Sequence, residues 1–495
     1  MNSVPPRPRG RLLAPALMLA LWLLFSIGAR PLLLPDEGRY AGVALEMLRG
    51  DALQPTLDGL PFFHKPPLLY WLDLLPLRLL GTNEFAARCA PALFGWLLGM
   101  ALFLHLRRRH GEAVARTGLL VLATSPLFFL GAQYVNHDIG VAACITAALL
   151  ATLRAVEDPR RVALRWLVLG WMFCGLGVLA KGLIGIVLPA AVIGPWLLAQ
   201  GRWRQVLALL HPAALLVFGA VALPWMVAMQ LRHPAFYDYF IVEQHFRRFT
   251  GTDFNNRMPF WFFVVVLPLL MLPWTLWLAP ALRRLRPVDP LLAFYAWWIV
   301  VIVGFFSLPE SKLVGYVMPA LAPMAALLAL VLVERPRATR RAGWIGAAFC
   351  VAVVGALAWK QPGSRRDLAR ALAAARAPGE RVVFIDDDYY DVPFYADLKA
   401  PVVIVSSWDD PDIARHDNWR KELADAARFA PDRGRSTLWT WDRVPELNCT
   451  PGRVWLLAPA DQVARLAALA QLKVVRAERG VELLVAPGRD CAKAP

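Results

Sequence analysis

The chain has 495 residues, of which 58% are hydrophobic, and its formal net charge at pH 7 is +16. Its mean hydropathy of +0.47 excludes an ordinary soluble protein. In a soluble protein such a charge would suggest nucleic-acid binding. Here the basic residues lie in short loops between apolar runs, so the charge indicates membrane topology and no nucleic-acid partner.

Apolar runs of membrane-spanning length recur about eleven times, which predicts a polytopic α-helical membrane protein. The predicted spans are 12–34, 88–106, 113–133, 138–153, 165–182, 183–199, 205–229, 259–282, 290–307, 313–333 and 342–359. The first run follows several arginines, as in a signal peptide. It is too long for one and lacks a small-residue cleavage site, so we expect a retained span.

The loops between these runs alternate in charge. Every second loop is rich in arginine, and together with the N-terminus these loops should be cytoplasmic. The opposite set comprises the loop 36–87, the turn before Asp138, the loop 230–258, the turn 308–312 and the tail after residue 360. We expect these segments to face the periplasm of a bacterium, on the outer side of the inner membrane.

The last part of the chain has the composition of a small soluble domain. Strands are predicted at 381–385, 401–405, 454–458 and 481–485, and a helix at 461–472, an alternation typical of an α/β module. We therefore predict a transmembrane domain over 1–360, with 36–87 as its outer-face loop, and a periplasmic α/β domain over 361–495.

Two smaller features of this tail allow more than one interpretation. The aspartates at 386–388 follow a strand and invite a metal site, but a solvated acidic loop is the simpler interpretation. Cys449 and Cys491 are the cysteines of the tail, and they can pair if the tail faces an oxidising compartment.

The segment 35–40 places two adjacent carboxylates directly after the first apolar run. Carboxylates so close to lipid are costly and need a function or a structural reason. The structural reason is that a proline followed by Asp36 and Glu37 is typical of a helix start. On such a helix Arg39 shares the face of Asp36.

Cations also gather on the predicted outer side, which the positive-inside rule depletes. They are Lys65, Lys181, Arg247, Arg248 and Lys312. A cluster of this kind needs an anion, and a lipid-linked phosphate at the outer leaflet would supply one. Carboxylates at Asp36, Glu37 and Asp138 could then take a proton from an incoming hydroxyl. Because the sequence has no nucleotide-binding loop, this combination indicates group transfer from a polyprenyl phosphate.

Each of these residues also has a purely structural interpretation. Asp138 can cap the span that follows it, and Lys181 can extend along the membrane to the outer interface. The segment 243–249 can be the solvated face of a loop helix.

The same segments resemble the bacterial 4-amino-4-deoxy-L-arabinose (aminoarabinose) lipid A transferases, which belong to the protein-mannosyltransferase-like class with the GT-C fold. The resemblance is carried by Pro35–Tyr40, Gly59–Leu68, Lys181–Gly182, Glu243–His245 and Phe305–Pro319. It covers roughly residues 10–335, and it is the combination of 35–40 with Lys65 and its two following prolines that is specific.

The resemblance implies an inverting transfer with Asp36 near the reacting sugar and Lys65 as a ligand of the donor phosphate. The candidate catalytic residues are Asp36, Glu37 and Asp138, and the candidate donor-phosphate ligands are Lys65, Arg39, Lys181, Arg247, Arg248 and Tyr316.

A metal site is the least defined expectation. The family usually has a glutamate at the position of His64, and that glutamate can pair with the loop histidine matching His245 around a divalent ion. Two histidines can still bind zinc, so His64 and His245 are the candidate metal ligands. No cofactor is required, because the leaving group is a phosphate that cations can neutralise.

These observations predict an inner-membrane glycosyltransferase that moves a sugar from undecaprenyl phosphate to a periplasmic-side acceptor. Aminoarabinose and lipid A are the leading pair, and membrane lipids are the other expected partners. A transferase that modifies protein or another glycan is an alternative within the class. A transporter or flippase is an alternative from another class, but it predicts charges near the middle of the membrane, whereas here they lie at the outer ends of the spans.

Overall fold

A computed structural model of the chain describes residues 12–247, 255–283, 289–466, 469 and 471–488. By packing, the chain divides into two compact units. Unit 1 comprises Met1–Arg30, Arg88–Ala228 and Asn256–Trp359, and unit 2 comprises Pro31–Ala87, Met229–Asn255 and Lys360–Pro495.

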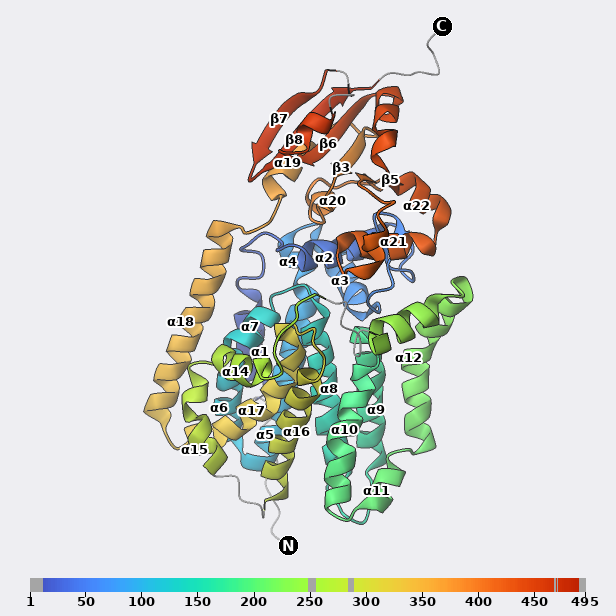
Figure 1. Cartoon of the computed structure of the whole chain (residues 1–495). Coiled ribbons are helices and arrows are strands. Elements are labelled where there is room, and N and C mark those ends of the chain that lie inside the picture. Colours follow the sequence, from blue (N-terminus) through green and yellow to red (C-terminus); the bar gives the residue numbers. More distant parts are fainter. Residues whose placement is uncertain (1–11, 248–254, 284–288, 467–468, 470, 489–495) are drawn as a thin grey trace. The chain divides into compact units, whose positions relative to one another are not determined.

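Unit 1 is helical, and its long helices run side by side (Figure 1). The elements are α1 (Leu13–Leu24), α5 (Cys89–His110), α6 (Glu112–Ala123), α7 (Pro126–Gly131), α8 (His137–Ala155), α9 (Leu164–Lys181), α10 (Ile184–Ala199), α11 (Trp203–Ala208), α12 (Pro212–Arg232), α14 (Phe262–Leu270), η3 (Trp274–Trp277), α15 (Leu278–Arg283), α16 (Pro290–Ser307), η4 (Val314–Ala320), α17 (Leu321–Leu332) and α18 (Pro336–Lys360). The helix α8 lies at the centre of this unit, since 83% of its apolar stretch is buried.

Among the described residues, seven helices are long and apolar enough to cross a membrane, and a bent pair raises the number to eight. The seven are Cys89–His110, His137–Ala155, Leu164–Lys181, Pro212–Arg232, Pro290–Ser307, Val314–Leu332 and Pro336–Lys360. The bent pair is Phe262–Leu270 with Trp274–Arg283, at 105°. The predicted class, a polytopic helical membrane protein, is confirmed.

Eleven spans were predicted, whereas seven or eight helices of the described residues have the length of a span. The runs 12–34, 113–133 and 183–199 contain helices of 12 residues, of 12 and 6 residues, and of 16 residues. In the second of these runs the hydroxyls of Thr124 and Ser125 donate to carbonyls of their own helix, and Pro126 then ends the backbone hydrogen bonding. A hydropathy profile averages over the apolar residues on both sides of such a break, so it does not detect that the helix ends there.

Unit 2 is built from three stretches of sequence that are far apart. Its elements are α2 (Asp36–Arg49), β1 (Thr56–Leu57), β2 (Leu60–Pro61), α3 (Leu68–Leu80), α4 (Glu84–Ala87), the π-helix η2 (Asp238–Arg247), α19 (Arg366–Ala375), β3 (Arg381–Ile385), α20 (Val392–Tyr395), β4 (Val403–Val405), η5 (Pro411–Arg415), α21 (Trp419–Arg428), α22 (Pro431–Thr437), β5 (Leu438–Trp439), η6 (Trp441–Cys449), β6 (Arg453–Pro459), η7 (Val463–Leu466), β7 (Lys473–Glu478) and β8 (Val481–Pro487). Within this unit, α2 lies beside α21 from the far end of the sequence (Figure 1).

A six-stranded sheet with the order β5-β4-β3-β6-β8-β7 forms the core of unit 2. The strands β5, β4, β3 and β6 are parallel, whereas β8 is antiparallel to both β6 and β7. The four predicted strands correspond to β3, β4, β6 and β8, so the predicted α/β character of the tail is confirmed. The strands β5 and β7 were not predicted.

The predicted helix at 461–472 is wrong in the described residues, which form only the short 3₁₀ helix η7. Leu466 and Leu469 of this segment are buried in the apolar core of the sheet. Packing against the sheet therefore outweighs the local helix propensity. Cys449 is disulfide-bonded, and Cys491 lies outside the described residues.

The compact units group the chain differently from the predicted domains, because 31–87 and 229–255 pack with the C-terminal stretch in unit 2. The division at residue 360 stays a prediction about domain organisation.

Candidate functional site

The carboxylates of the segment 35–40 stand at the start of α2, which begins at Asp36 with both acids in its first turn. Glu37 is fully buried, and its Oε2 accepts a hydrogen bond of 2.9 Å from the backbone N–H of Leu33. Glu37 therefore stabilises the backbone of the segment that precedes α2. Asp36 is more accessible, with 24% of its side chain exposed, and its Oδ1 lies 2.5 Å from Nη2 of Arg39.

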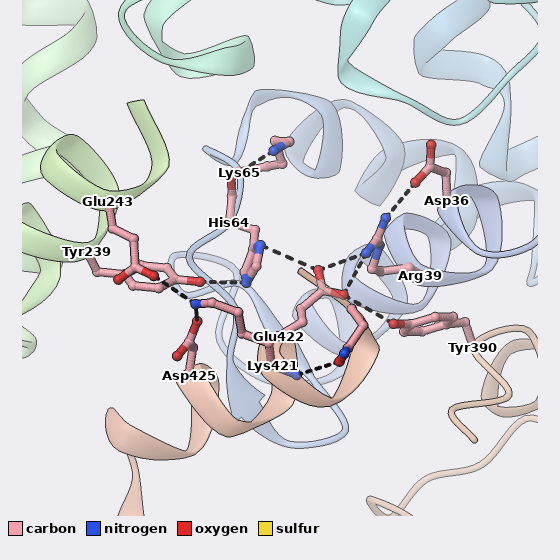
Figure 2. Close-up of polar contacts among 11 residues, drawn as sticks. Asp36, Arg39, His64, Lys65, Tyr239, Glu243, Tyr390, Lys421, Glu422 and Asp425 are labelled. Atoms are coloured by element: carbon pink, nitrogen blue, oxygen red, sulfur yellow. Dashed lines mark hydrogen bonds and ion pairs between the residues drawn. The ribbon is translucent and has the colours of Figure 1, made fainter. Parts of the chain in front are cut away.

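Arg39 joins α2 to α21. Its Nη1 donates to both carboxylate oxygens of Glu422, at 2.9 and 2.6 Å, while Nη2 donates to Asp36 (Figure 2). The guanidinium lies 5.0 Å and 5.5 Å from the ring centres of Tyr40 and Tyr390. An arginine held between two carboxylates and two aromatic faces has a fixed orientation. Its hydrogen bond to Asp36 therefore also restricts the orientation of that carboxylate.

Glu422 is the centre of this network, and only 6% of its side chain is exposed. Besides Arg39, it accepts a hydrogen bond of 3.1 Å from the hydroxyl of Tyr390. Burial raises the pKa of Tyr390 well above its usual value, and the charge of Glu422 adds to the effect. The phenol therefore keeps its proton and donates a hydrogen bond to the carboxylate.

His64 lies on the other side of Glu422, with Nδ1 at 3.6 Å from Oε1 of the carboxylate. Its Nε2 is 2.5 Å from the hydroxyl of Tyr239, and its ring stacks on Phe62 at 5.1 Å. Burial raises the pKa of Tyr239 well above its usual value, and the nearby carboxylate of Asp425 adds to the effect. Tyr239 is thus a neutral hydroxyl that fixes the imidazole.

The predicted metal ligands do not fit a divalent ion. The two ring nitrogens of His64 face Tyr239 and Glu422, and Nδ1 of His245 lies 2.6 Å from the carbonyl oxygen of Phe240. Within the described ranges, no group of three or more histidine, cysteine, aspartate or glutamate side chains could hold a metal ion. We therefore derive no step through a metal.

A second set of charges ties the π-helix η2 to α21. Lys421 donates to Glu243 at 2.8 Å and to Asp425 at 2.7 Å. Since Glu243 belonged to the predicted loop motif, this contact gives that motif a structural role. It holds the segment that carries Tyr239 against the helix that carries Glu422.

The predicted phosphate ligands of unit 2 occupy different positions. Lys65 is half-buried, its Nζ donates to the carbonyl of His64 at 3.1 Å, and it lies apart from the Arg39–Glu422 pair (Figure 2). Arg247 is exposed at the end of η2. Arg248 lies outside the described residues.

Unit 1 contains a separate polar cluster at Asp138 and Lys181. The two side chains form an ion pair with 8% and 12% of their surfaces exposed, and Nζ of Lys181 lies 4.5 Å from the ring centre of Tyr316. A Cβ at Gly315 would meet Oδ2 of Asp138 at 2.0 Å, so only glycine fits beside the carboxylate.

This geometry corrects the structural interpretations of the two residues. The cap of α8 is Asn136, whose side chain accepts from the backbone N–H of Asp138 at 3.1 Å. Lys181 pairs with Asp138. Lys312, another of the predicted outer cations, is buried, and its ammonium donates to the carbonyls of Met258 and Pro309.

The acidic loop of the tail is also different from its prediction, because Asp388 is buried and not solvated. It neighbours Asp58, which is likewise buried at the turn between β1 and β2. Burial raises the pKa of both carboxyl groups well above the usual value. The charge of Glu46 adds to the shift at Asp58, and the charge of Asp58 adds to the shift at Asp388.

The chain is similar to known glycosyltransferases. The family model for dolichyl-phosphate-mannose-protein mannosyltransferase matches residues 64–228. An undecaprenyl phosphate-alpha-4-amino-4-deoxy-L-arabinose arabinosyl transferase of Pseudomonas paraeruginosa is 34% identical over 354 residues, which are 69% of this chain and 64% of that relative. A transferase of the same name from Aeromonas salmonicida is 32% identical over 358 residues, 69% of this chain and 65% of the relative.

The solved structure of ArnT from Cupriavidus metallidurans, bound to undecaprenyl phosphate, matches with a TM-score of 0.83. The match covers 97% of this chain and 98% of that chain at 22% identity. The chain is thus similar in sequence to the aminoarabinose transferases and shares the fold of ArnT. With this fold and seven or eight helices of spanning length among the described residues, it is an integral, multi-pass membrane protein. The aligned region is slightly less than two thirds of the length of the curated transferases.

Three residues of the site, Glu422, Tyr390 and Tyr239, were not predicted from the sequence; they surround Arg39 and His64. A signal for Glu422 was present in the sequence. The stretch 419–428 is strongly amphipathic, and Glu422 and Asp425 fall on its buried face together with Leu423 and Ala426. Acidic residues on the buried face of a helix need cationic or hydrogen-bonding partners.

Proposed function

We propose that this protein transfers 4-amino-4-deoxy-L-arabinose from undecaprenyl phosphate to lipid A on the periplasmic side of the bacterial inner membrane. The observation that carries the proposal is the 34% identity over 354 residues to the arabinosyl transferase of Pseudomonas paraeruginosa. The presence of undecaprenyl phosphate in the matched ArnT structure supports the choice of donor lipid.

The proposed reaction breaks the bond between the anomeric carbon of the sugar and the donor phosphate oxygen. A new bond forms from that carbon to an acceptor oxygen, and the electron pair of the broken bond leaves on undecaprenyl phosphate. An attacking hydroxyl gives its proton to Asp36. An attacking phosphate oxygen that is already ionised has no proton to give, and Asp36 then stabilises positive charge on the sugar. Attack opposite the leaving phosphate inverts the anomeric carbon.

The contacts in unit 2 support Asp36 as the reacting carboxylate. Glu37 is fully buried and binds the backbone of Leu33, and Glu422 is nearly buried and bound by Arg39 and Tyr390. Asp36 keeps 24% of its side chain exposed, and its second oxygen points away from Arg39 (Figure 2).

The same contacts change the role that we propose for Arg39. Its two terminal nitrogens are engaged by Asp36 and Glu422, so a positioning role suits it better than the predicted contact with the donor phosphate. We propose that Arg39 orients Asp36, and that Glu422 and Tyr390 in turn orient Arg39.

Lys65 is the proposed cation for the phosphate in this unit. We expect Lys65→Ala to weaken donor binding at least about tenfold, since a hydrogen bond to a charged group is worth roughly 1.5–3 kcal/mol. The measurement is the apparent affinity of the folded, purified protein for the polyprenyl-phosphate donor.

A matched control for this variant is Lys399→Ala, because Lys399 belongs to the same unit but 68% of its side chain is exposed. We expect the control to bind donor as the parent protein does. Equal donor affinity in the Lys65 variant and the parent would contradict the assignment.

For unit 1 we propose that the ion pair of Asp138 and Lys181 holds an ammonium against the ring of Tyr316. This arrangement supports Lys181 as an anion-binding group whose position is set by Asp138. It makes Asp138 a weaker candidate than Asp36 for the general base.

A second candidate function is the modification of a protein. The observation that favours it is the match of residues 64–228 to the protein mannosyltransferase model. Mass spectrometry of lipid A and of the envelope proteins, from cells with and without this protein, separates the two functions. We expect lipid A to gain one aminopentose only when the protein is present. Unchanged lipid A together with a newly glycosylated protein would favour the second candidate.

The proposed orientation places the N-terminus in the cytoplasm and the segments of unit 2 in the periplasm. It is supported by the arginines of alternate loops, such as those at 107–109 and 335–341. Reporter fusions after Arg109 and after Gly363 should therefore report cytoplasm and periplasm, respectively. The same compartment for both fusions would refute this orientation.

A further inference from the structure

Unit 1 contains an apolar groove with a volume of about 660 Å³, formed by α1, α6 and α18. Its lining includes Met18 and Trp22 from α1, Leu119 and Leu120 from α6, and Trp344 and Ala347 from α18. The volume is within the range of ligand pockets. Several lining side chains face outward, since Met18 is 66% exposed and Trp344 is 73% exposed.

At one end of the groove, α1 and α18 both contact the C-terminal part of α6. Trp22 donates from its indole nitrogen to the carbonyl of Ala123 at 2.8 Å, which anchors α1 to the end of α6. The helix α18 meets α6 through glycines, because a Cβ at Gly343 would lie 3.2 Å from Leu120 and one at Gly346 would lie 2.6 Å from a backbone oxygen of Thr124. The α1 wall is thus anchored by the side chain of Trp22, the α18 wall approaches α6 at its glycines, and Trp344 of α18 lines the space between them.

The opposite end of the groove carries positive charge. Arg116 and Arg340 line it, and each is the fifth residue of its helix, α6 and α18 respectively. Arg340 is exposed, and Arg116 is 63% exposed. Arg116 uses its Nε to pair with Glu112 at 3.0 Å, a contact that does not involve its two terminal nitrogens.

We propose that this groove binds an anionic diacyl phospholipid, with acyl chain in the apolar part and the phosphate between Arg116 and Arg340. The groove has a positively charged end followed by an apolar stretch, which complements the phosphate head group and the acyl chain of such a lipid. The helices that form the groove belong to a membrane-spanning unit, so the ligand is available in the surrounding leaflet. In the orientation proposed above, this is the cytoplasmic leaflet, whereas the proposed transfer takes place on the periplasmic side.

Another occupant would be the first eleven residues of the chain, which precede α1 in the sequence. They contain Arg7, Arg9 and Arg11 and no acidic residue. Their charge has the same sign as that of the two groove arginines, so electrostatics favours the anionic lipid.

The test is native mass spectrometry of the full chain released from nanodiscs that contain phosphatidylglycerol or, separately, phosphatidylcholine. We expect retention of phosphatidylglycerol by the parent protein, and a loss of roughly fivefold for each of Arg116→Gln and Arg340→Gln. Arg337→Gln is the matched control, because it removes an exposed arginine from the same turn of α18 that does not line the groove. Ala347→Phe should reduce retention by filling the apolar part.

Three results would overturn the proposal. Equal retention of the two lipids would show that the arginines do not select a lipid with a net negative charge. A tenfold rise in retention after deletion of residues 1–11 would mean that the chain's own N-terminus occupies the groove. Loss of added undecaprenyl phosphate, and not of phosphatidylglycerol, in the two arginine variants would assign the groove to the donor. Thermal unfolding of each variant identifies those that lose lipid because they do not fold.

Discussion

Asp36→Asn should lower turnover at least ~100-fold while the protein stays folded. General-base catalysis contributes typically ~10²–10⁴-fold, and an amide cannot take a proton from the acceptor or stabilise positive charge as a carboxylate does. Asparagine keeps the shape and can still accept a hydrogen bond from Arg39, which donates to Asp36 at 2.5 Å. The lost interaction with the helix dipole would cost only about 0.3–1 kcal/mol of stability. Turnover with saturating donor and the unfolding temperature are the two measurements.

Glu37→Gln is the control for this prediction. A glutamine can still accept the 2.9 Å hydrogen bond from Leu33, so the chain should enter α2 as before. The next position on a helix also points about 100° away from Asp36. We expect a mild effect on turnover. If Asp36→Asn turned over at nearly the parent rate, the catalytic assignment would fail and Asp138 would be the carboxylate to test.

Glu422→Ala should destabilise unit 2 by about 3–5 kcal/mol, because it leaves the guanidinium of Arg39 buried without its main partner. Glu422 holds that guanidinium through two hydrogen bonds, with 6% of its side chain exposed. Activity should fall as well, since Arg39 would no longer hold Asp36 in place. Denaturant unfolding of the purified protein gives the free energy.

Glu446→Ala is the matched control, because Glu446 pairs with an arginine of the same unit but 54% of its side chain is exposed. Exposed pairs contribute little, so the change should stay within about 0.5 kcal/mol. The double variant Arg39→Gln with Glu422→Gln should lose less stability than the sum of its single variants. Additive losses would mean that the two side chains do not act as a pair.

The helical membrane class and four of the six strands of the sheet could be predicted because both depend on local patterns. A span is a long apolar run, and a buried strand is a short apolar run between turn residues. The number of spans could not be predicted in this way. A pair such as Thr124 and Ser125 followed by proline breaks a helix without changing the hydropathy around it.

In the candidate site, too, local contacts could be predicted from the sequence and long-range contacts could not. The contact of Asp36 with Arg39 could be predicted because the residues are three positions apart on one helix. Asp138 and Lys181 were both recognised as unusual, but their pairing depends on how α8 packs against α9, which no local pattern gives. The role of Glu422 depends on a contact across 383 positions of sequence, and a single sequence carries no record of such a contact.

The construction of unit 2 from three distant stretches also sets an order of events during synthesis. A ribosome that adds roughly 5–20 residues per second needs about 20 to 80 s to travel from Arg39 to its partner on α21. For that time α2 exists with its two acids and its arginine but without the carboxylate that fixes them. Chains released before α21 would still contain every apolar helix of unit 1, yet their Arg39 would have no Glu422. The network that fixes Arg39 is thus completed only when translation is nearly finished.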